Sequence, residues 1–418
     1  MSIHHRSLKS LKEGRWFKLI CGASYQHLPA IRNLALAYGL AGADCIDVAA
    51  DPAVVEAVRE AFQAISYIEQ TEELALQSGC TLPTSLPLLM VSFSDGEDPH
   101  FRKAVFEATA CPADCLRPCE SICPASAIAF NDIFAGVIED RCYGCGRCLP
   151  VCPAQHIDTI TKATAIDAIA PQLLHQVDAI EIHTQVGRYD SFMALWAAIQ
   201  PYITHLTLIS ISCPDHDDVI NYLWQLYKGM QPLAIPLIWQ TDGRPMSGDI
   251  GKGTTHTTIK FAKKVLQAGP PGFVQLAGGT NAHTVSKLHE LTTIAGTCTT
   301  FPDIFGQKTG NSQPTFGGIA YGSYARHLVS PLLDKLPIFQ SEPASAPETT
   351  LRANHNVQNN LEASPIYLAQ AVQMAQSLVN PIKTSQSGHS VPSLQTAGGR
   401  LPAPVENPSS RCYSSLFE

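Results

Sequence analysis

The sequence lacks three features that would point to nucleic acids, membranes or secretion. Basic residues are not in excess: 28 Lys and Arg stand against 36 Asp and Glu, for a net charge of −8, so no positive field is available to a nucleic acid. A helix that spans a bilayer needs about 18 consecutive apolar residues, and the sequence has no such stretch. Residues 1–9 contain no apolar leader. We therefore expect a cytoplasmic protein in a reducing compartment, with no nucleic-acid partner and no membrane span.

Several catalytic signatures are also missing. The sequence contains neither G-x-S-x-G nor H-E-x-x-H, and no G-x-G-x-x-G follows an expected strand. Lys252 lies in a glycine-rich loop, but its spacing does not match G-x4-G-K-[ST]. These absences argue against a serine-hydrolase triad, a zinc protease and both common nucleotide-binding fingerprints.

Cysteine, in contrast, is abundant, with 14 residues in the chain and eight of them between positions 111 and 152. In a reducing compartment such residues indicate metal ligation or packing and not disulfides. Zinc sites usually pair two C-x2-C knuckles or include histidine. The second group of four instead has the bacterial ferredoxin spacing C-x2-C-x2-C-x3-C-P, in Cys142, Cys145, Cys148 and Cys152-Pro153.

The first group of four cysteines ends in the same C-x3-C-P but has three residues where the ferredoxin spacing has two. In two-cluster ferredoxins, the fourth cysteine of each run ligates the other cluster. This crossing predicts two iron–sulfur clusters, one on Cys123, Cys142, Cys145 and Cys148 and the other on Cys111, Cys115, Cys119 and Cys152. Because the first group has the looser spacing, the cluster on Cys111, Cys115, Cys119 and Cys152 could be either [4Fe-4S] or [3Fe-4S].

Outside the cysteines, short apolar runs alternate with amphipathic stretches. Strands that are apolar on both faces are typical of parallel sheets covered by helices. They predict an α/β fold, a (β/α)8 barrel-like parallel core with a bacterial-type 2[4Fe-4S] ferredoxin domain inserted near the third strand; a doubly wound open sheet is the alternative. The eight strands are expected at residues 17–24, 45–50, 88–93, 179–183, 206–212, 236–240, 273–277 and 318–321.

The expected division of the chain follows from this pattern. Residues 1–108 and 162–338 form the two parts of the barrel-like domain, and residues 109–161 form the double-cluster insertion. Residues 339–418 are rich in Ser, Pro, Ala, Asn and Gln, so we expect a mostly disordered tail. One helix is expected near 366–379, either capping the barrel or docking a partner.

Barrel proteins bind ligands at the C-terminal ends of their strands, and phosphate often lies against the loops after strands seven and eight. Backbone N–H groups at a helix start suit a phosphate, and an arginine could add a charge-assisted contact; tight turns are the alternative. His183 and Cys213 end strands four and five and should face the same mouth. The candidate phosphate-binding residues are Gly278, Gly279, Thr280, Asn281, Gly322, Ser323 and Arg326.

Several stretches resemble, in order, the cyanobacterial light-dependent period (LdpA) family. They begin with Phe17-Lys-Leu-Ile-Cys-Gly-Ala-Ser and Ala41-Gly-Ala-Asp-Cys-Ile-Asp-Val, continue through the cysteine region, and end with the segments 273–281 and 318–326. The resemblance covers roughly residues 8–335, and the polar tail lies outside it.

The resemblance implies an iron–sulfur protein that passes the cell's redox state, set by photosynthetic electron flow, to the circadian clock. It implies partners among the clock proteins of the Kai system and their associated kinases, with ferredoxin or the quinone pool as the redox source. The family's ligands correspond to the eight cysteines above. The alternative is a barrel oxidoreductase whose clusters pass electrons to a flavin or another phosphate-bearing ligand in the barrel mouth.

Overall fold

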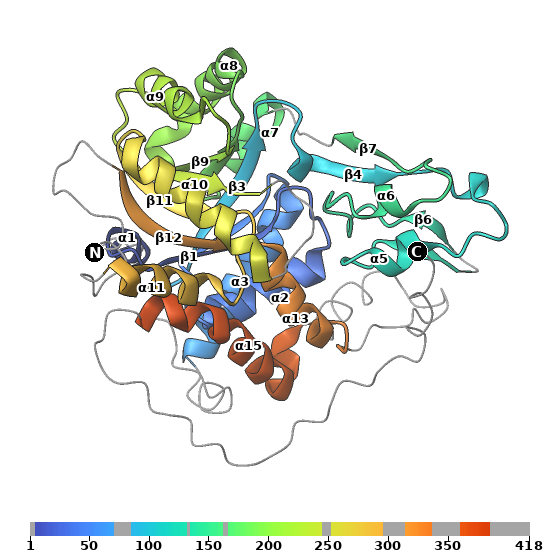
Figure 1. The fold of residues 1–418 in the computed structure, drawn as a ribbon. Helices are drawn as coiled ribbons and strands as arrows, with labels where there is room; N and C mark the ends of the chain where they lie inside the picture. The colour runs from blue at the N-terminus through green and yellow to red at the C-terminus, as the bar shows by residue number, and fades with distance from the viewer. Residues whose placement is uncertain are drawn as a thin grey trace. The chain divides into compact units, whose positions relative to one another are not determined.

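Eight parallel strands close into a barrel at the centre of the protein (Figure 1). The computed structural model describes residues 5–70, 85–131, 134–161, 166–244, 252–295, 314–336 and 360–384. Around the barrel, each strand pairs in parallel with both neighbours. In their order around the barrel the strands are β1 (Trp16–Gly22), β12 (Pro314–Tyr321), β11 (Gly272–Ala277), β10 (Leu237–Asp242), β9 (Leu208–Pro214), β8 (Ala179–His183), β3 (Leu88–Ser94) and β2 (Cys45–Ala49).

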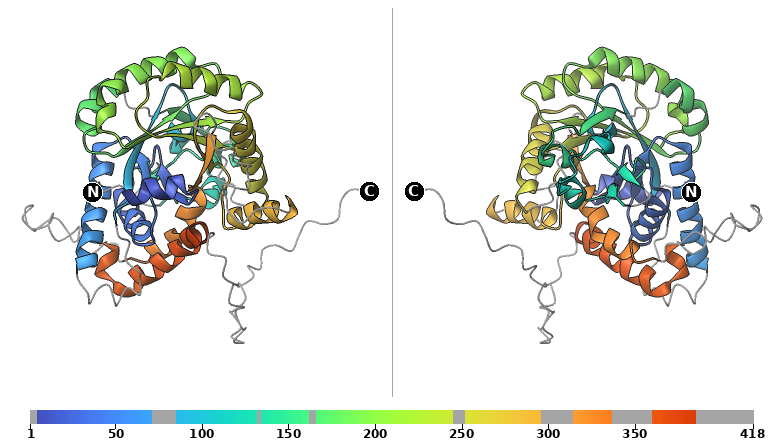
Figure 2. Two further views of the ribbon diagram at one scale, coloured as in Figure 1. Left: turned by 90° about the vertical axis from the view of Figure 1, so that its left-hand side faces the viewer. Right: turned by 90° about the vertical axis from the view of Figure 1, so that its right-hand side faces the viewer.

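This arrangement confirms the barrel prediction over the open sheet. The strands are buried along almost their whole length, which is why their sequences read as continuous apolar runs. A ring of helices covers the outside (Figure 2). They are α2 (Leu28–Leu40), α3 (Pro52–Gln70), α7 (Ile166–Leu173), α8 (Tyr189–Ile199), α9 (Val219–Gly229), α10 (Thr255–Ala268), α11 (Thr284–Ala295) and α13 (Ser323–Leu333).

An amino-terminal helix, α1 (His5–Lys12), packs against the end of the barrel at which the strands begin. Its Leu11 is buried in one cluster with Trp16, Cys45 and Leu88, which are first residues of strands. The helix therefore covers the apolar floor of the barrel and leaves the opposite end, where ligands bind in barrel proteins, for the functional site.

Helix α15 (Pro365–Thr384) packs against α2 and α13 and belongs to the barrel's outer layer (Figures 1 and 2). Its residues Leu368, Val372 and Leu378 are buried in the main hydrophobic core. This is the capping role expected for the helix near 366–379. The rest of the predicted disordered tail, residues 339–359 and 385–418, lies outside the described residues.

We expect Leu378→Ala to lower the free energy of unfolding by about 2–5 kcal/mol, because it removes a buried side chain and leaves a cavity. Leu378 is 3% exposed, whereas Ile366 on the same helix is 69% exposed. Ile366→Ala is therefore a matched control, expected to change stability by less than about 0.5 kcal/mol. Urea unfolding followed by tryptophan fluorescence measures both. Equal effects from the two variants would show that α15 is not part of the core.

The insertion lies between β3 and α7 and has its own small core (Figure 1). Strand β4 (Arg102–Val105) pairs antiparallel with β7 (Asp158–Thr161), and β5 (Ile128–Phe130) pairs with β6 (Ala135–Val137). Two short helices, α5 (Pro118–Ile122) and α6 (Cys148–Val151), carry cysteines. The insertion begins before residue 109, the boundary predicted from the sequence, because β4 pairs with β7, the last strand of the insertion. Strand β4 contains no cysteine that would mark it in the sequence.

Among the described helices, none has the length and apolar character needed to cross a membrane.

Candidate metal centre

Four thiols from both cysteine groups surround one cavity in the insertion. Cys142, Cys145 and Cys148 line it from the second group, and Cys123 lines it from the first. Burial raises the pKa of the Cys148 thiol, and the neighbouring Cys145, Cys142 and Cys123 sulfurs add to the shift, to about 12. The structure thus brings together the four residues predicted to share one cluster. The rest of the wall is mostly apolar and includes Ala104, Ala125, Ala127, Ile128 and Leu149.

The remaining four cysteines, Cys111, Cys115, Cys119 and Cys152, also lie close to one another. Burial raises the pKa of the Cys119 thiol, and the sulfurs of Cys152 and Cys111 contribute to the same shift. Burial likewise raises the pKa of Cys111, with contributions from Cys115 and Cys152. Cys152, the last cysteine of the second group, therefore lies with three cysteines of the first group. The exchange of the two closing cysteines is a feature of this structure.

Backbone N–H groups point at the sulfur atoms, as is usual for thiolates that hold iron–sulfur clusters. Ala104 donates to Cys142 Sγ at 3.3 Å, and Ala127 donates to Cys123 Sγ at 3.2 Å. Burial opposes ionisation of Cys152, but hydrogen bonds from the N–H groups of residues 154–157 outweigh it and lower the pKa of that thiol. These hydrogen bonds favour the thiolate at Cys152, whereas burial and the neighbouring sulfurs favour the neutral thiol at Cys111, Cys119 and Cys148, which a bound metal ion would deprotonate.

The donors and the lining indicate which metal group the quartets fit. Each quartet offers four thiols, and the cavity of Cys123, Cys142, Cys145 and Cys148 has a mostly apolar wall. Four cysteine ligands in the ferredoxin spacing fit an iron–sulfur cluster.

Gly144 fixes the ligand loop against the barrel side of the insertion. It has a φ of +72°, and a Cβ atom there would lie 2.3 Å from the carbonyl oxygen of Arg102. Only glycine combines this backbone conformation with so close an approach. The loop between Cys142 and Cys145 is thereby pressed onto the start of β4.

Arg326, a predicted phosphate ligand, contacts this same loop. Its guanidinium carbon lies 4.3 Å from the ring centroid of Tyr143, between two cluster cysteines. Its nitrogens donate to the carbonyl of Ile20 at 2.8 Å and to Ser323 Oγ at 3.1 Å. Arg326 therefore joins the end of β1, the start of α13 and the cluster loop.

The other predicted phosphate residues make contacts within the barrel. Thr280 Oγ1 donates to the carbonyl of Ala320 at 2.6 Å, and Asn281 Nδ2 donates to Thr254 Oγ1 at 3.1 Å. Gly278 has a φ of +64°, and a Cβ atom there would lie 1.7 Å from Asp242 Oδ1. Gly279 also has a positive φ, of +104°, and packs against Thr254. These contacts describe tight turns at the strand ends, and phosphate binding there stays a prediction.

Charged residues occupy the interior of the barrel, which sequence reasoning did not single out. Lys18 on β1 is fully buried and lies 2.5 Å from Glu181 Oε2 and 3.1 Å from Asp47 Oδ2. Gln240 Nε2 donates to Glu181 Oε1 at 2.7 Å, and Ser92 Oγ donates to Asp47 Oδ1 at 2.8 Å. The available signal was a charged residue in the middle of an apolar strand, where parallel strands bury both faces.

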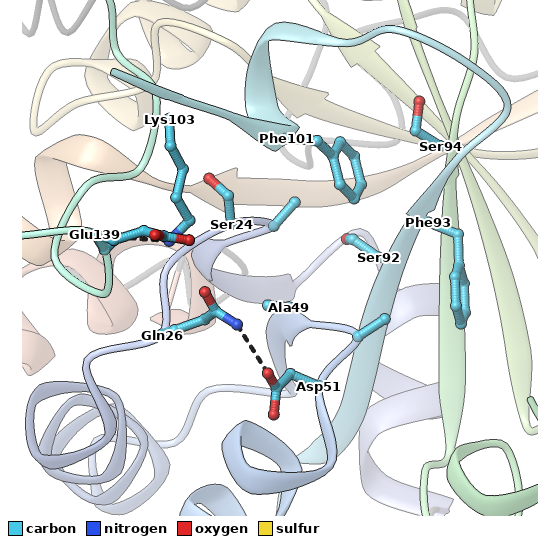
Figure 3. A pocket seen from close by; sticks show the side chains of 12 residues that line it. Ser24, Gln26, Ala49, Asp51, Ser92, Phe93, Ser94, Phe101, Lys103 and Glu139 are labelled. Atoms are coloured by element: carbon cyan, nitrogen blue, oxygen red, sulfur yellow. Dashed lines mark hydrogen bonds between the residues drawn. The ribbon is translucent and has the colours of Figure 1, made fainter. Parts of the chain in front are cut away.

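A pocket of about 240 Å³ opens at the C-terminal ends of β1, β2 and β3 and is completed by the insertion (Figure 3). Gln26 donates to Asp51 across it at 2.8 Å, and Lys103 Nζ donates to the carbonyl of Glu139 at 2.6 Å. Lys103 directly precedes Ala104, whose N–H contacts Cys142 Sγ. The pocket thus lies beside the quartet that contains Cys142.

The fold and these quartets define the class of protein: an iron–sulfur protein built on a parallel α/β barrel. Two family models match the chain, the LdpA Fe-S cluster-binding domain over residues 111–163 and the light dependent period A C-terminal domain over residues 173–381. Light dependent period A of Synechococcus elongatus is 46% identical over 382 residues, which cover 91% of this chain and 95% of that protein. The chain belongs to the light dependent period A family, as its sequence motifs predict.

Two further similarities are local or distant. An uncharacterized ferredoxin of Methanocaldococcus jannaschii is 47% identical over 36 residues, or 9% of this chain and 22% of that protein. Among solved structures, wild-type GGGPS from Thermoplasma volcanium aligns with a TM-score of 0.32 and 10% identity, covering 79% of this chain and 97% of the other.

Proposed function

We propose that this protein senses the redox state of the cell through two iron–sulfur clusters and passes it to the circadian clock. The observation that carries the proposal is the cluster loop around Tyr143, which is held on the barrel by Arg326. One quartet would hold a [4Fe-4S] cluster, and the quartet with the looser spacing, Cys111, Cys115, Cys119 and Cys152, would hold a [4Fe-4S] or [3Fe-4S] cluster.

The clusters would supply one-electron redox chemistry, at potentials set by hydrogen bonds to sulfur and by solvent exposure. The chain's own residues set both quantities. Ala104 and Ala127 donate to cluster sulfurs, and Cys142 and Cys148 are buried.

Arg326 connects the loop that carries Cys142 and Cys145 to the outer helices of the barrel. Tyr143 and Arg326 would lie beside the negative charge that reduction of a cluster in this quartet would add, and Arg326 lies in the first turn of α13. Helix α13 packs on α2 and α15, so the outer face of these helices is the surface that would report the redox state.

The partners we propose are the clock proteins of the Kai system and their associated kinases, with ferredoxin or the quinone pool as the redox source. Their binding to the full chain should differ between dithionite-reduced and air-free oxidised protein. Co-precipitation with purified clock proteins under the two conditions tests this proposal. Equal binding in both states, with intact clusters, would contradict it.

Arg326→Gln is expected to shift the midpoint potential of the cluster near Tyr143 to more negative values. A lost positive charge costs the reduced state on the order of 1 kcal/mol at an effective dielectric constant of about 20, which is about 40 mV for one electron. A potentiometric titration followed by EPR measures the shift. Arg326→Lys should retain most of the wild-type potential, and Arg59→Gln, an exposed change on α3, should leave it unaltered. An unchanged midpoint potential in Arg326→Gln would show that the charge of Arg326 does not influence the cluster.

The pocket in Figure 3 favours a second candidate function, an oxidoreductase that passes electrons to a flavin or another ligand. A cavity at the strand ends of a barrel, next to a cluster ligand, is where such an acceptor would bind. Denaturation of the purified holoprotein and fluorescence of the supernatant tests for flavin. Flavin at about one per chain would favour the oxidoreductase. If no flavin is released and none binds on titration, the oxidoreductase is contradicted and the redox sensor is retained.

A further inference from the structure

A second group of metal-ligating side chains lies away from the cysteines, at the mouth of the barrel. Asp98 and His100 belong to the segment that leads from β3 into the insertion, and His183 is the last residue of β8. One ligand atom from each of the three residues lies within 4.8 Å of the other two. Two imidazoles and one carboxylate form a donor set common to divalent first-row metals.

The hydrogen bonds around these residues orient the two rings. His183 Nε2 lies 3.2 Å from Glu181 Oε1, and its Nδ1 lies 3.9 Å from Asp98 Oδ1. His100 Nδ1 lies 2.7 Å from the same Asp98 oxygen, and its Nε2 lies 3.5 Å from Asp242 Oδ2. A carboxylate on the far nitrogen of a metal-binding histidine fixes the ring and increases its basicity, which is the position Glu181 has relative to His183.

The concentration of carboxylates at this end of the barrel favours a cation. The side chains of Asp47, Asp98, Glu181 and Asp242 are at most 14% exposed. Lys18 pairs with two of them, Asp47 and Glu181. Buried charges need a partner, because burial without one is costly. Asp98 and Asp242 both face His100, and a cation bound among these three residues would offset the charge of the carboxylates.

We propose that Asp98, His100 and His183 bind one divalent first-row transition metal ion in the barrel mouth, with Asp242 as the next carboxylate and Glu181 as the outer partner of His183. This site is separate from the thiolate quartets and does not depend on the sensor function. Its donors are nitrogen and oxygen, a set that accepts Mn²⁺, Fe²⁺ and Zn²⁺ with affinity rising along that series, so Mn²⁺ serves as the spectroscopic probe.

The location connects this ion to the insertion. His100 is two residues before Arg102, the first residue of β4, and the ring of Phe101 lies edge-on to His183 with centroids 5.4 Å apart. Strand β4 carries Ala104, which donates to Cys142 Sγ. A bound ion would therefore fix the segment that joins the barrel to the quartet containing Cys142.

Mn²⁺ titration of the cluster-loaded full chain tests the proposal, because free Mn²⁺ has a six-line EPR signal that binding removes. We expect one tight Mn²⁺ per chain, and a loss of affinity of at least about tenfold in His100→Gln and Asp98→Asn. Glu181→Gln should weaken binding by about 10–100-fold as an outer partner. His205→Gln is the matched control, since His205 pairs with His175 away from the mouth, with ring centroids 4.5 Å apart.

Far-UV circular dichroism reports whether the barrel of each variant has folded, and the optical spectrum of the clusters reports the same for the insertion. Absence of Mn²⁺ binding by the wild-type chain at millimolar concentration would overturn the proposal, as would equal binding by His100→Gln and Asp98→Asn. If those variants do not fold, the anomalous signal of Mn²⁺ in wild-type crystals decides. A peak between Asp98, His100 and His183 supports the site, and its absence there contradicts it.

Discussion

Replacing Cys123 with alanine is expected to abolish the [4Fe-4S] signal of the cluster whose other ligands are Cys142, Cys145 and Cys148. The reason is geometric: Cys123 belongs to the first cysteine group in the sequence but lines the cavity of the second. A cube that loses one thiolate loses its fourth iron or is lost altogether. EPR of the anaerobically reduced protein should therefore fall to about half of the wild-type [4Fe-4S] intensity if both quartets hold cubes.

Cys152→Ala is the reciprocal control, because Cys152 lies with Cys111 and Cys119 at the other quartet. It should remove the signal that Cys123→Ala retains, and Cys148→Ser should resemble Cys123→Ala. If Cys123→Ala and Cys111→Ala instead removed the same signal, each run would hold its own cluster and the crossed assignment would be wrong. The barrel should stay folded in all of these variants, since its core shares no residue with the core of the insertion.

Lys18→Met is expected to destabilise the barrel by about 3–5 kcal/mol, because it leaves two buried carboxylates without their cation. Lys18 is fully buried, and its ammonium contacts Asp47 and Glu181. Burial would lower the pKa of Lys18, but these carboxylates raise it above its ordinary value, so the lysine is charged in the folded state. The midpoint of urea unfolding, followed by tryptophan fluorescence, measures the effect.

Lys264→Met provides the matched control for this prediction. Lys264 also pairs with a carboxylate, that of Asp215 at 3.0 Å, but both side chains are at least 35% exposed. An exposed pair contributes about 0–1 kcal/mol. A second variant, Lys18→Met combined with Asp47→Asn and Glu181→Gln, should recover part of the lost stability, because the two carboxylates that Lys18 neutralised are then uncharged. Equal effects of Lys18→Met and Lys264→Met would contradict the buried ion network.

Much of the fold could be predicted because its signals are local. Each strand has apolar residues on both faces, as in residues 88–93 and 273–277, and each is followed by a helix, which for β3 comes after the insertion. The ferredoxin spacing is also local, and a known rule of ligand exchange extends it to Cys123 and Cys152. Helix α15 was expected from its periodicity, but the surface on which it packs, α2, is far away in the sequence.

The barrel mouth could not be predicted to the same extent, because its contacts are not local. Asp98 and His100 meet His183 only after β3 and β8 pair around the barrel. Phosphate binding by Arg326 stays a prediction, and the contact of its guanidinium with Tyr143 in the insertion was not expected from the sequence. No periodicity or spacing in the sequence relates these positions. The charged residues within β1, β2 and β8 were visible, but their pairing depends on the register of the closed barrel.

Counting iron and acid-labile sulfide in protein purified without oxygen tests the presence of two clusters most directly, when combined with EPR before and after reduction. We predict about eight iron and eight sulfide per chain, or about seven iron if the quartet of Cys111, Cys115, Cys119 and Cys152 holds a [3Fe-4S] cluster. The protein should be brown and give two distinguishable EPR signals. Colourless protein that carries zinc in place of iron would contradict the assignment of both quartets.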